Sequence, residues 1–399
     1  MKQLRAGLIA WGLLGAAAAG AAELPAVPTA ASRSAAVEFL GSVTLPHRLS
    51  YGDGVIGGLS GITWVPEENC FYFISDDRGD YPSAHFYRGQ AVIHDGHLAT
   101  FDITGVTMLR RGNGEPYPRG ARDWDDMAPN TGAPDEGYAD AEAIAWSSRS
   151  GTLFWSSETK WKAAASPRLI EARTDGSQVR ALPIPKMLLP VPKLPSSDHR
   201  EGARDNGDME AIALSPDENT LWLAVEEPLL QDGERPTPEN GALVRFNRLD
   251  RNSGAVLAQY AYHVDAMPAA PKGDRSAGPG VSDIAALDAD HLLVLERTFV
   301  AGVGYFQRIY VADWSNASDV AKRHSLLGGA PFRLMGKHLL LDLGKALIPS
   351  DNFEGMGLGP QLADGRRLML ICSDDNYRSD QRTTILAFAV DVAAALAVP

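Results

Sequence analysis

Short runs of apolar and β-prone residues recur along the chain after residue 36, and each run is bounded by Gly, Asp, Asn or Pro. The runs show little of the three-to-four-residue periodicity that marks an amphipathic helix. Five of them are residues 71–74, 153–155, 221–225, 292–295 and 368–372. The pattern therefore predicts a chain built largely from β-strands that are joined by turns.

A self-similar polar unit surrounds each of these runs. An opening motif before the run contributes one polar residue, in order Ser60, Glu142, Glu210, Asp283 and Glu354. An acid follows the run, in order Asp76, Glu158, Glu226, Glu296 and Asp374. The midpoint of every pair falls in turn-forming sequence, such as Asp364-Gly365. Each unit is therefore predicted to be an antiparallel hairpin whose two polar residues share one end.

The spacing of these units predicts the fold. The opening residues stand 82, 68, 73 and 71 positions apart, which is too long for one hairpin but suits a four-stranded blade with generous loops. We therefore expect an all-β fold, a single β-propeller of five or six four-stranded blades, because radial closure removes exposed sheet edges. The N-terminal strand at 37–43 is expected to close the ring by pairing with a strand near 384–388.

The N-terminus has the features of a secretory signal. Within residues 1–22, Lys2 and Arg5 precede an apolar stretch that ends in small residues. A retained membrane anchor is the alternative, although the stretch is short and rich in Ala and Gly. We expect residues 23–36 to be a linker, residues 37–392 to form the propeller, and the protein to be periplasmic or secreted with no stable membrane insertion after signal removal.

Charge and cysteine content narrow the classes of partner. The formal net charge of −13 makes nucleic acid an unfavourable partner. The two cysteines cannot build a disulfide framework, and no group of Cys and His has zinc spacing. Cys70 and Cys372 either form one disulfide or remain two separate buried thiols.

The paired acids indicate a cation site. If the hairpins are the inner strands of consecutive blades, their acidic ends meet at one mouth of the channel, where several carboxylates need cations or protons to coexist. Calcium suits such oxygen ligands best, and magnesium or manganese is the alternative. The expected metal ligands are Asp76, Asp77, Glu158, Glu226, Glu296, Asp374 and Asp375. A second interpretation gives the opening carboxylates a structural role, in which they accept backbone N–H bonds from an adjacent loop.

Basic residues follow the acids in four units and indicate an anionic substrate. They are Arg78, Lys160, Arg297 and Arg378. Guanidinium and ammonium groups bind phosphate oxygens, while a cation beside them polarises a phosphoryl or acyl group. The alternative is that these bases only neutralise neighbouring acids.

The repeated units resemble a known family. The segments 58–62 with 75–79, 140–144 with 157–158, and 206–212 with 226–227 look like the bacterial phytase-like family that is described as having esterase-like activity, and the later units extend the resemblance across residues 37–390. The resemblance implies an exported propeller whose repeated acids carry phosphoester or ester hydrolysis. Ser60 departs from the pattern because it stands where the other units carry an acid, and Ala143 and Ala211 stand where glycine is usual.

Three functions remain open at this point. The first is a metal-dependent hydrolase of phosphate esters, with Glu142, Glu210, Glu354 and Asp283 as catalytic residues. The second is a non-catalytic binding propeller that calcium or an ion-pair ring makes rigid. The third is a lactonase-type calcium propeller. We expect a monomer that binds an anionic small molecule, and the substrate, the general base and the number of metals stay undetermined.

Overall fold

The computed structural model describes residues 36–397, apart from residues 53, 78–82, 119–138, 162–165, 191–193, 195–197, 274–276 and 347. All described residues belong to one compact unit, Ser32–Pro399. The predicted signal peptide at 1–22, the predicted linker except for its last residue, and Arg78 lie outside the described residues. In the part of the chain that is described, no helix is both long and apolar enough to span a bilayer.

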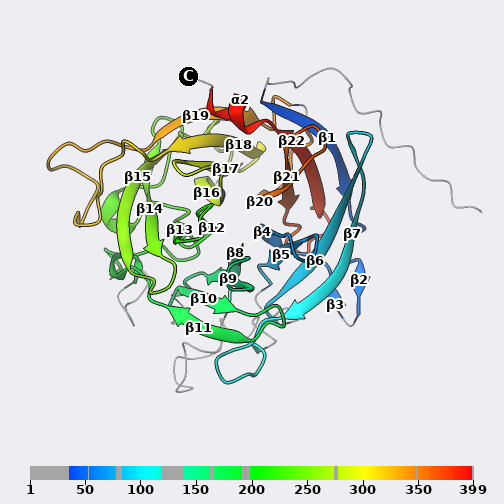
Figure 1. Cartoon of the computed structure of the whole chain (residues 1–399). Helices are drawn as coiled ribbons and strands as arrows, with labels where there is room; N and C mark the ends of the chain where they lie inside the picture. Colours follow the sequence, from blue (N-terminus) through cyan, green and yellow to red (C-terminus); the bar gives the residue numbers. More distant parts are fainter. Residues whose placement is uncertain are drawn as a thin grey trace, which may run out of the picture. The chain divides into compact units, whose positions relative to one another are not determined.

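Five four-stranded antiparallel sheets form the blades of a β-propeller (Figure 1). Blade 1 contains β4 (Leu59–Val65), β5 (Cys70–Ser75), β6 (His85–His94) and β7 (His97–Met108). Blade 2 contains β8 (Ala141–Ser147), β9 (Thr152–Ser157), β10 (Arg168–Ala172) and β11 (Gln178–Leu182). Blade 3 contains β12 (Ala211–Leu214), β13 (Thr220–Ala224), β14 (Ala242–Asp250) and β15 (Val256–Val264).

Blade 4 contains β16 (Ala277–Ala286), β17 (His291–Val300), β18 (Gly304–Asp313) and β19 (Gly336–Asp342). Blade 5 contains β20 (Phe353–Gln361), β21 (Arg367–Ser373), β22 (Thr384–Val390) and the N-terminal strand β1 (Val37–Thr44). The remaining elements are the short strands β2 (Ser50–Tyr51) and β3 (Gly54–Val55), the 3-10 turns η2 (Lys186–Leu188) and η4 (Leu230–Asp232), and the helix α2 (Val392–Leu396). The predicted all-β propeller is confirmed, with five blades.

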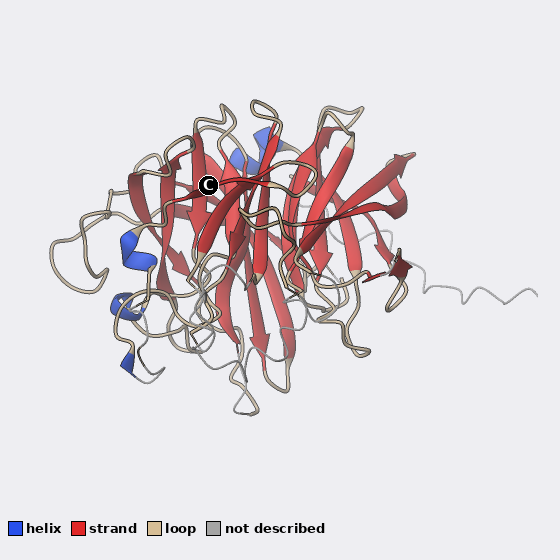
Figure 2. Ribbon diagram, turned by 90° about the horizontal axis from the view of Figure 1, so that it is seen from below, coloured by secondary structure: helices blue, strands red, loops and turns tan. Residues whose placement is uncertain are grey.

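The first strand of each blade lines the axis. Neighbouring first strands contact one another in the order β4, β8, β12, β16 and β20, and β20 contacts β4 again, so the inner ring is closed. The predicted hairpins are the first two strands of each blade. Seen from the side, the strands of all blades run between two ends that carry the loops (Figure 2).

The ring is closed by chain segments from opposite ends of the sequence. Strand β1 pairs antiparallel with β22 from Val37 opposite Val390 to Thr44 opposite Thr384. Phe39 and Phe388 add a ring contact across this pair, with centroids 5.3 Å apart. The predicted closure is therefore confirmed, and β1 covers the edge that β22 would otherwise expose.

Apolar side chains fill the space between blades. One cluster joins blades 2, 3 and 4 through Phe154, Trp222, Phe246 and Ile284, all of them buried. The burial of apolar surface is the dominant favourable contribution to the free energy of folding. Cys70 and Cys372 are both buried and both free, so the structure has two separate thiols and no disulfide.

Blades 1 and 5 approach so closely that only glycine fits between their inner strands. A Cβ built on Gly355 of β20 would lie 1.9 Å from the carbonyl oxygen of Ser60 in β4. Ala143 and Ala211, which stand at the same position of blades 2 and 3, are fully buried without this restriction. The departure from glycine noted at those two positions therefore reflects wider spacing in these blades.

Candidate functional site: an acidic cavity at one end of the channel

One repeated backbone contact positions the acidic ends of the hairpins. In four blades the N–H of the acid after the second strand donates to a carbonyl at the start of the opening motif. The bonds are Asp76 to Gly58 at 3.0 Å, Glu158 to Asp140 at 2.8 Å, Glu226 to Asp208 at 2.8 Å and Asp374 to Asn352 at 2.9 Å. The opening residue, two positions further along the first strand, therefore lies at the same end of the blade.

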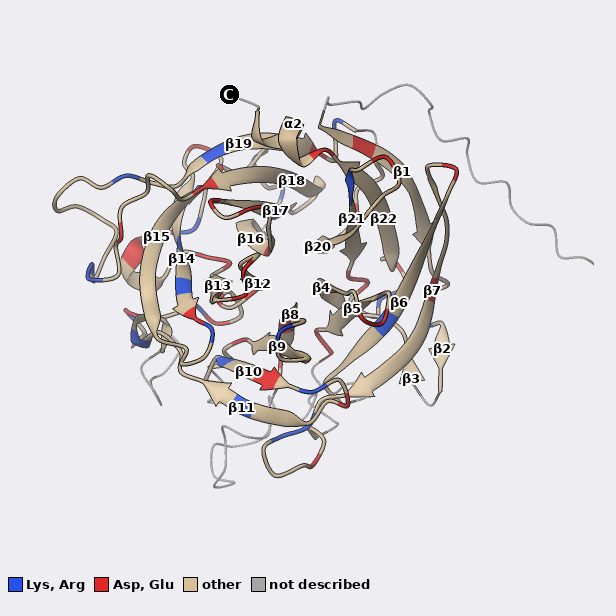
Figure 3. Cartoon of the chain, in the orientation of Figure 1, with Lys and Arg blue, Asp and Glu red and all other residues tan. Residues whose placement is uncertain are grey.

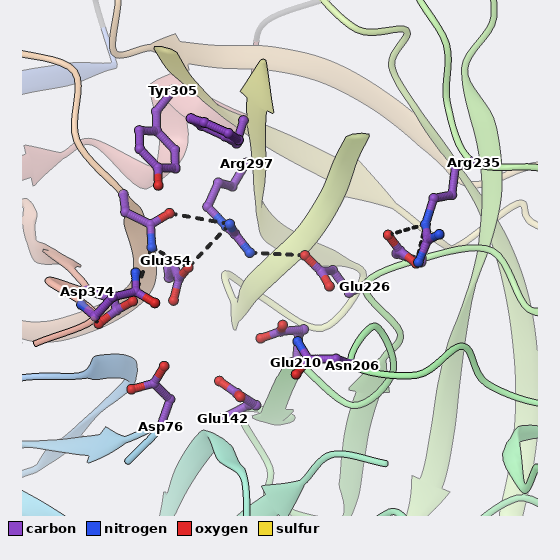
Figure 4. A pocket seen from close by; sticks show the side chains of 14 residues that line it. Asp76, Glu142, Asn206, Glu210, Glu226, Arg235, Arg297, Tyr305, Glu354 and Asp374 are labelled. Carbon is purple, nitrogen blue, oxygen red and sulfur yellow. Dashed lines mark hydrogen bonds and ion pairs between the residues drawn. The ribbon is translucent and has the colours of Figure 1, made fainter. Parts of the chain in front are cut away.

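These ends meet at a cavity of about 420 Å³, a volume typical of small-molecule sites. Every blade contributes to its wall, and acidic residues gather around the channel (Figures 3 and 4). Its acidic lining consists of Asp76, Glu142, Glu210, Glu226, Glu227, Glu354 and Asp374. The remaining lining residues are Arg235, Arg297, Asn206, Asn352, Asn376, Phe299 and Tyr305. Seven carboxyl groups face two guanidinium groups, so the cavity attracts cations.

Glu158 lies beneath the cavity wall and joins two groups of carboxyl oxygens. Its ligand atom lies within 4.8 Å of those of Asp140 and Glu142, and in a second group it lies within 4.8 Å of those of Glu210 and Glu226. Glu158 is fully buried, and its Oε2 has no hydrogen-bond partner. An ionised carboxylate oxygen buried without a partner is costly. The donor set therefore fits a cation that takes oxygen ligands.

Burial and mutual repulsion shift the protonation of these groups. Burial raises the pKa of Glu158 well above its usual range, and Asp208 raises it further. Burial, followed by the charge of Glu142, does the same to the pKa of Glu210. Burial also raises the pKa of Glu226 to about 7. These carboxyl groups therefore need either protons or a cation near neutral pH.

Arg297 of β17 spans two blades on the opposite side of the cavity. Its Nη2 lies 3.0 Å from Oε1 of Glu226 in blade 3, and its Nη1 lies 3.3 Å from Oε1 of Glu354 in blade 5 (Figure 4). Nη1 also donates to Oδ1 of Asn352 at 3.3 Å, whereas the buried Nε has no hydrogen-bond partner. Burial alone would lower the pKa of Arg297, but the charges of Glu354 and Glu226 raise it. The guanidinium is thus permanently charged and held in one orientation.

Ser60 takes the place of an acid in blade 1 without losing contact with the site. Its Oγ donates to Oε2 of Glu142 at 3.1 Å, and Ser60 itself is buried. The hydroxyl therefore orients a cavity carboxylate from the neighbouring blade.

Five of the predicted acids are not lining residues of the cavity. They are Glu158, which is described above, and Asp77, Asp283, Glu296 and Asp375. Asp283 is buried at the interface with blade 5, where its Oδ2 accepts the N–H of Met356 at 2.7 Å and its Oδ1 accepts that of Ile284 at 2.8 Å. This is the structural role that the alternative interpretation describes. Glu296 accepts hydrogen bonds from the hydroxyl of Tyr262 and from Nζ of Lys337, each at 2.7 Å.

The other two acids lie in the loops that follow the second strands of blades 5 and 1. Oδ1 of Asp375 accepts the N–H of Gly58 at 3.1 Å and that of Tyr377 at 3.1 Å. Asp77 is buried, and its N–H donates to Oγ of Ser75. Each of these residues directly follows an acid that lines the cavity.

The four predicted bases are placed differently from one another. Arg297 lines the cavity. Lys160 is half-buried and is not among the lining residues, while Arg378 is exposed and forms an ion pair with Asp380 at 2.9 Å. Arg78 lies outside the described residues. Arg235 is the base that contacts Glu227. It lies in a loop eight residues further along the chain, and the other repeated units have neither Lys nor Arg at this position.

Several site residues were not selected from the sequence. Asp140 and Asp208 belong to the opening motifs and lie two positions before the residues that were chosen, so the repeat itself could have indicated them. Asn352 occupies the same position in blade 5. Phe299 follows Glu296 by three positions, as Trp161 follows Glu158 and Tyr377 follows Asp374, so the repeat could have indicated an aromatic residue there. Tyr305 lies on the third strand of its blade, outside the repeated hairpin.

Fold and site together define a five-bladed propeller with a carboxylate-lined cavity at one end of its channel. The phytase-like family, described as "esterase-like activity of phytase", matches residues 55–377, so the chain belongs to this family. None of the curated proteins matches the chain.

Two solved structures with some likeness to the chain are the following. The WD40 repeats of RRP9 share 10% identity over 90% of this chain and 99% of that chain, with a TM-score of 0.38. A luciferin-regenerating enzyme shares 10% identity over 84% of this chain and 92% of that chain, with a TM-score of 0.34. TM-scores this low do not relate the functions of those proteins to the function of this chain.

Proposed function

We propose that the protein is an exported hydrolase of phosphate esters that depends on a divalent cation. The observation that supports this proposal is a single cavity in which buried carboxyl groups face a fixed guanidinium. Carboxylate oxygens suit the cation, and Arg297 suits a phosphate. Family membership agrees with hydrolysis of an ester, and both phosphomonoesters and phosphodiesters fit the chemistry.

Glu158, with Asp140 and Glu142, would hold the cation, and Glu226 lies close to Glu158. Calcium is the proposed ion because it takes six to eight oxygen ligands with loose geometry, and magnesium or manganese is the alternative. When bound, the cation would neutralise carboxylate charge and stabilise the negative charge that develops on a phosphoryl group.

Arg297 would bind and orient the phosphate. Its contacts with Glu226 and Glu354 fix the guanidinium before substrate arrives, so less conformational entropy is lost on binding. Arg235 carries the second positive charge of the wall.

Hydrolysis requires a water oxygen to form a bond to phosphorus while the bond from phosphorus to the alcohol oxygen breaks. One proton of the water must leave, and the departing alcohol oxygen must gain one. Glu142 and Glu354 line the cavity and are proposed to orient the water and accept its proton. Glu210, whose pKa is raised by burial, is proposed to hold a proton near neutral pH and to donate it to the departing alcohol oxygen. We assign Asp283 to blade packing and not to catalysis.

Location and partners belong to the proposal as well. The signal-like sequence of residues 1–22 supports export to the periplasm or the exterior, where calcium is plentiful. The net charge of −13 disfavours nucleic acid as a partner, and we propose that a small anionic substrate binds together with the cation. We propose a monomer, because the closed ring leaves no unpaired inner strand.

The test is hydrolysis of aryl phosphate monoesters, aryl phosphate diesters and short acyl esters, with and without a chelator. We expect phosphate ester turnover that chelation removes and that calcium restores. Glu210→Gln should lower kcat by at least about 100-fold, since it removes a group that acts in proton transfer. Activity that is indifferent both to chelation and to Glu210→Gln would contradict the metal mechanism.

A binding propeller is the second candidate, and the ion pairs of Arg297 favour it because they already join blades 3, 4 and 5. In that case chelation would lower the melting temperature while no ester is hydrolysed. A lactonase-type propeller would cleave lactones in preference to phosphate esters in the same assays.

A further inference from the structure

One hairpin at the cavity differs from the others in length. In blades 1, 2, 3 and 5 the second strand ends directly before or within two residues of its acid, at Ser75, Ser157, Ala224 and Ser373. In blade 4, β17 continues four residues past Glu296, to Val300, and β18 returns from Gly304. We call residues 297–306, which this extension adds, the blade 4 lip.

Strand alternation gives the lip two faces. Arg297 and Phe299 lie on the same face of β17, and Tyr305 of β18 is the direct cross-strand partner of Phe299. These three residues line the cavity, whereas Thr298 and Phe306 line a small separate pocket on the other face. The lip therefore adds a base and two aromatic rings to a wall that is otherwise acidic.

Phe299 and Tyr305 form an aromatic pair that is held in place. Their ring centroids lie 4.8 Å apart at an interplanar angle of 44°. The hydroxyl of Tyr305 accepts a hydrogen bond from Nε2 of Gln381 at 3.1 Å, and its backbone N–H donates to Oγ of Ser350 at 3.2 Å. Both rings are only partly buried, so part of each faces the cavity.

The other lining residues that the structure describes are all Asp, Glu, Asn or Arg, so this pair is the apolar part of the described wall. Phe299 follows Arg297 by two positions, which corresponds to about 6.6 Å along a strand. If Arg297 binds the phosphate of a substrate, a ring attached to that phosphate directly or through a short linker would lie against Phe299. Aromatic rings stack there or meet edge to face.

We propose that the blade 4 lip selects phosphate esters whose alcohol carries an aromatic ring, as in aryl or nucleoside phosphates. This inference rests on the proposed phosphate site at Arg297. Phe299 and Tyr305 determine specificity and take no part in the chemical step. They contribute to affinity for the organic part of the substrate, while Arg297 and the cation bind its phosphate.

Non-hydrolysable phosphonates test the proposal without relying on turnover. The affinities of phenylphosphonate, cyclohexylphosphonate and methylphosphonate are measured by titration calorimetry with the calcium-loaded protein. Phenylphosphonate is expected to bind about tenfold more tightly than methylphosphonate, with cyclohexylphosphonate between them, because an aromatic pair adds to the effect of buried area. Equal affinity for the phenyl and cyclohexyl compounds would overturn the selection of aromatic rings.

Substitutions in the blade 4 lip test whether the ring of Phe299 causes the preference for phenylphosphonate. Phe299→Ala should weaken phenylphosphonate binding about five- to tenfold and leave methylphosphonate unchanged, while Phe299→Trp should preserve the preference. Val303→Ala is the matched control, because Val303 lies in the turn of the same hairpin and is 43% exposed. If Phe299→Ala weakened the binding of both phosphonates equally, the inference would be overturned. The proposed function would still stand, because the wild-type protein binds a phosphonate. If no phosphonate binds to the wild-type protein, the proposed function fails, and this inference fails with it.

Discussion

At the scale of single residues, the opening residues of the repeated units have different roles. Glu210 and Asp283 are both predicted opening residues, yet the strand register aligns Asp283 with Ala211, because Ile212 and Ile284 stand at the same position of their first strands. Glu210 lines the cavity, while Asp283 accepts two backbone N–H groups. The sequence predicts polar residues at both places, but it does not distinguish a ligand from a blade-packing residue. The contacts of the side chain decide this, and they come from the neighbouring blade.

This difference predicts opposite outcomes for two conservative substitutions. Asp283→Asn should lower the free energy of unfolding by about 1–3 kcal/mol, because the amide offers one acceptor oxygen to two buried donors. Hydrolysis per folded molecule should stay unchanged. Glu210→Gln should instead remove hydrolysis without loss of stability, since the uncharged amide replaces a carboxyl group that burial keeps protonated near neutral pH.

Denaturant unfolding and phosphate ester assays on the same preparations measure both effects. Asp364→Asn is the control for the substitution itself, because Asp364 lies in an exposed turn and contacts Arg366. Loss of activity in folded Asp283→Asn would return Asp283 to the catalytic group.

At the scale of elements, the sequence predicts the hairpins and the closure of the ring well. Alternating apolar runs and turn residues are local signals, and they place the first two strands of every blade. Strand β17 shows what such signals miss. The polar residues 296–298 interrupt its apolar run, so the repeat predicts that the strand ends at Glu296, whereas β17 continues to Val300 and brings Arg297 and Phe299 to the cavity.

The closure by β1 predicts a sharp effect of truncation. A chain that lacks residues 1–44 should lose cooperative thermal unfolding and aggregate, because β22 becomes an exposed edge strand and its contacts with β1 are lost. A chain that lacks only residues 1–35 keeps β1 and should unfold as the longer protein does. Circular dichroism and size-exclusion chromatography of the two truncated chains make the comparison. Equal behaviour of both would show that β1 is dispensable.

At the scale of the whole molecule, the propeller brings acids from four of its five blades to one cavity. Glu158 is central to this arrangement, because it belongs to both groups of carboxyl oxygens and has a buried oxygen without a partner. Stability should therefore depend on whatever neutralises this charge. A ligand that binds only the folded state raises the free energy of unfolding according to its concentration and affinity.

Calcium should raise the melting temperature, and Glu158→Gln should remove most of this increase. The same substitution should raise the melting temperature of the calcium-free protein, because it removes one charge from a buried acidic cluster. Glu171→Gln is the matched control, since Glu171 is also a buried acid of blade 2 but contacts Arg180 and Thr152 outside the cavity. Scanning calorimetry with and without chelator measures all three proteins. An undiminished calcium effect in Glu158→Gln would place the cation elsewhere.

The sequence by itself determined the strand content, the four-stranded repeat, the closure of the ring and the pairing of polar residues at hairpin ends. All of these follow from local periodicity, turn chemistry and spacing. Only the tertiary structure decided which acids face the cavity, that Arg297 lies between Glu226 and Glu354, and that an aromatic pair forms part of the wall. The physical reason is that the alternation of apolar and polar residues along a strand specifies only its two faces. The neighbouring blades and the length of each hairpin decide which residues those faces contact.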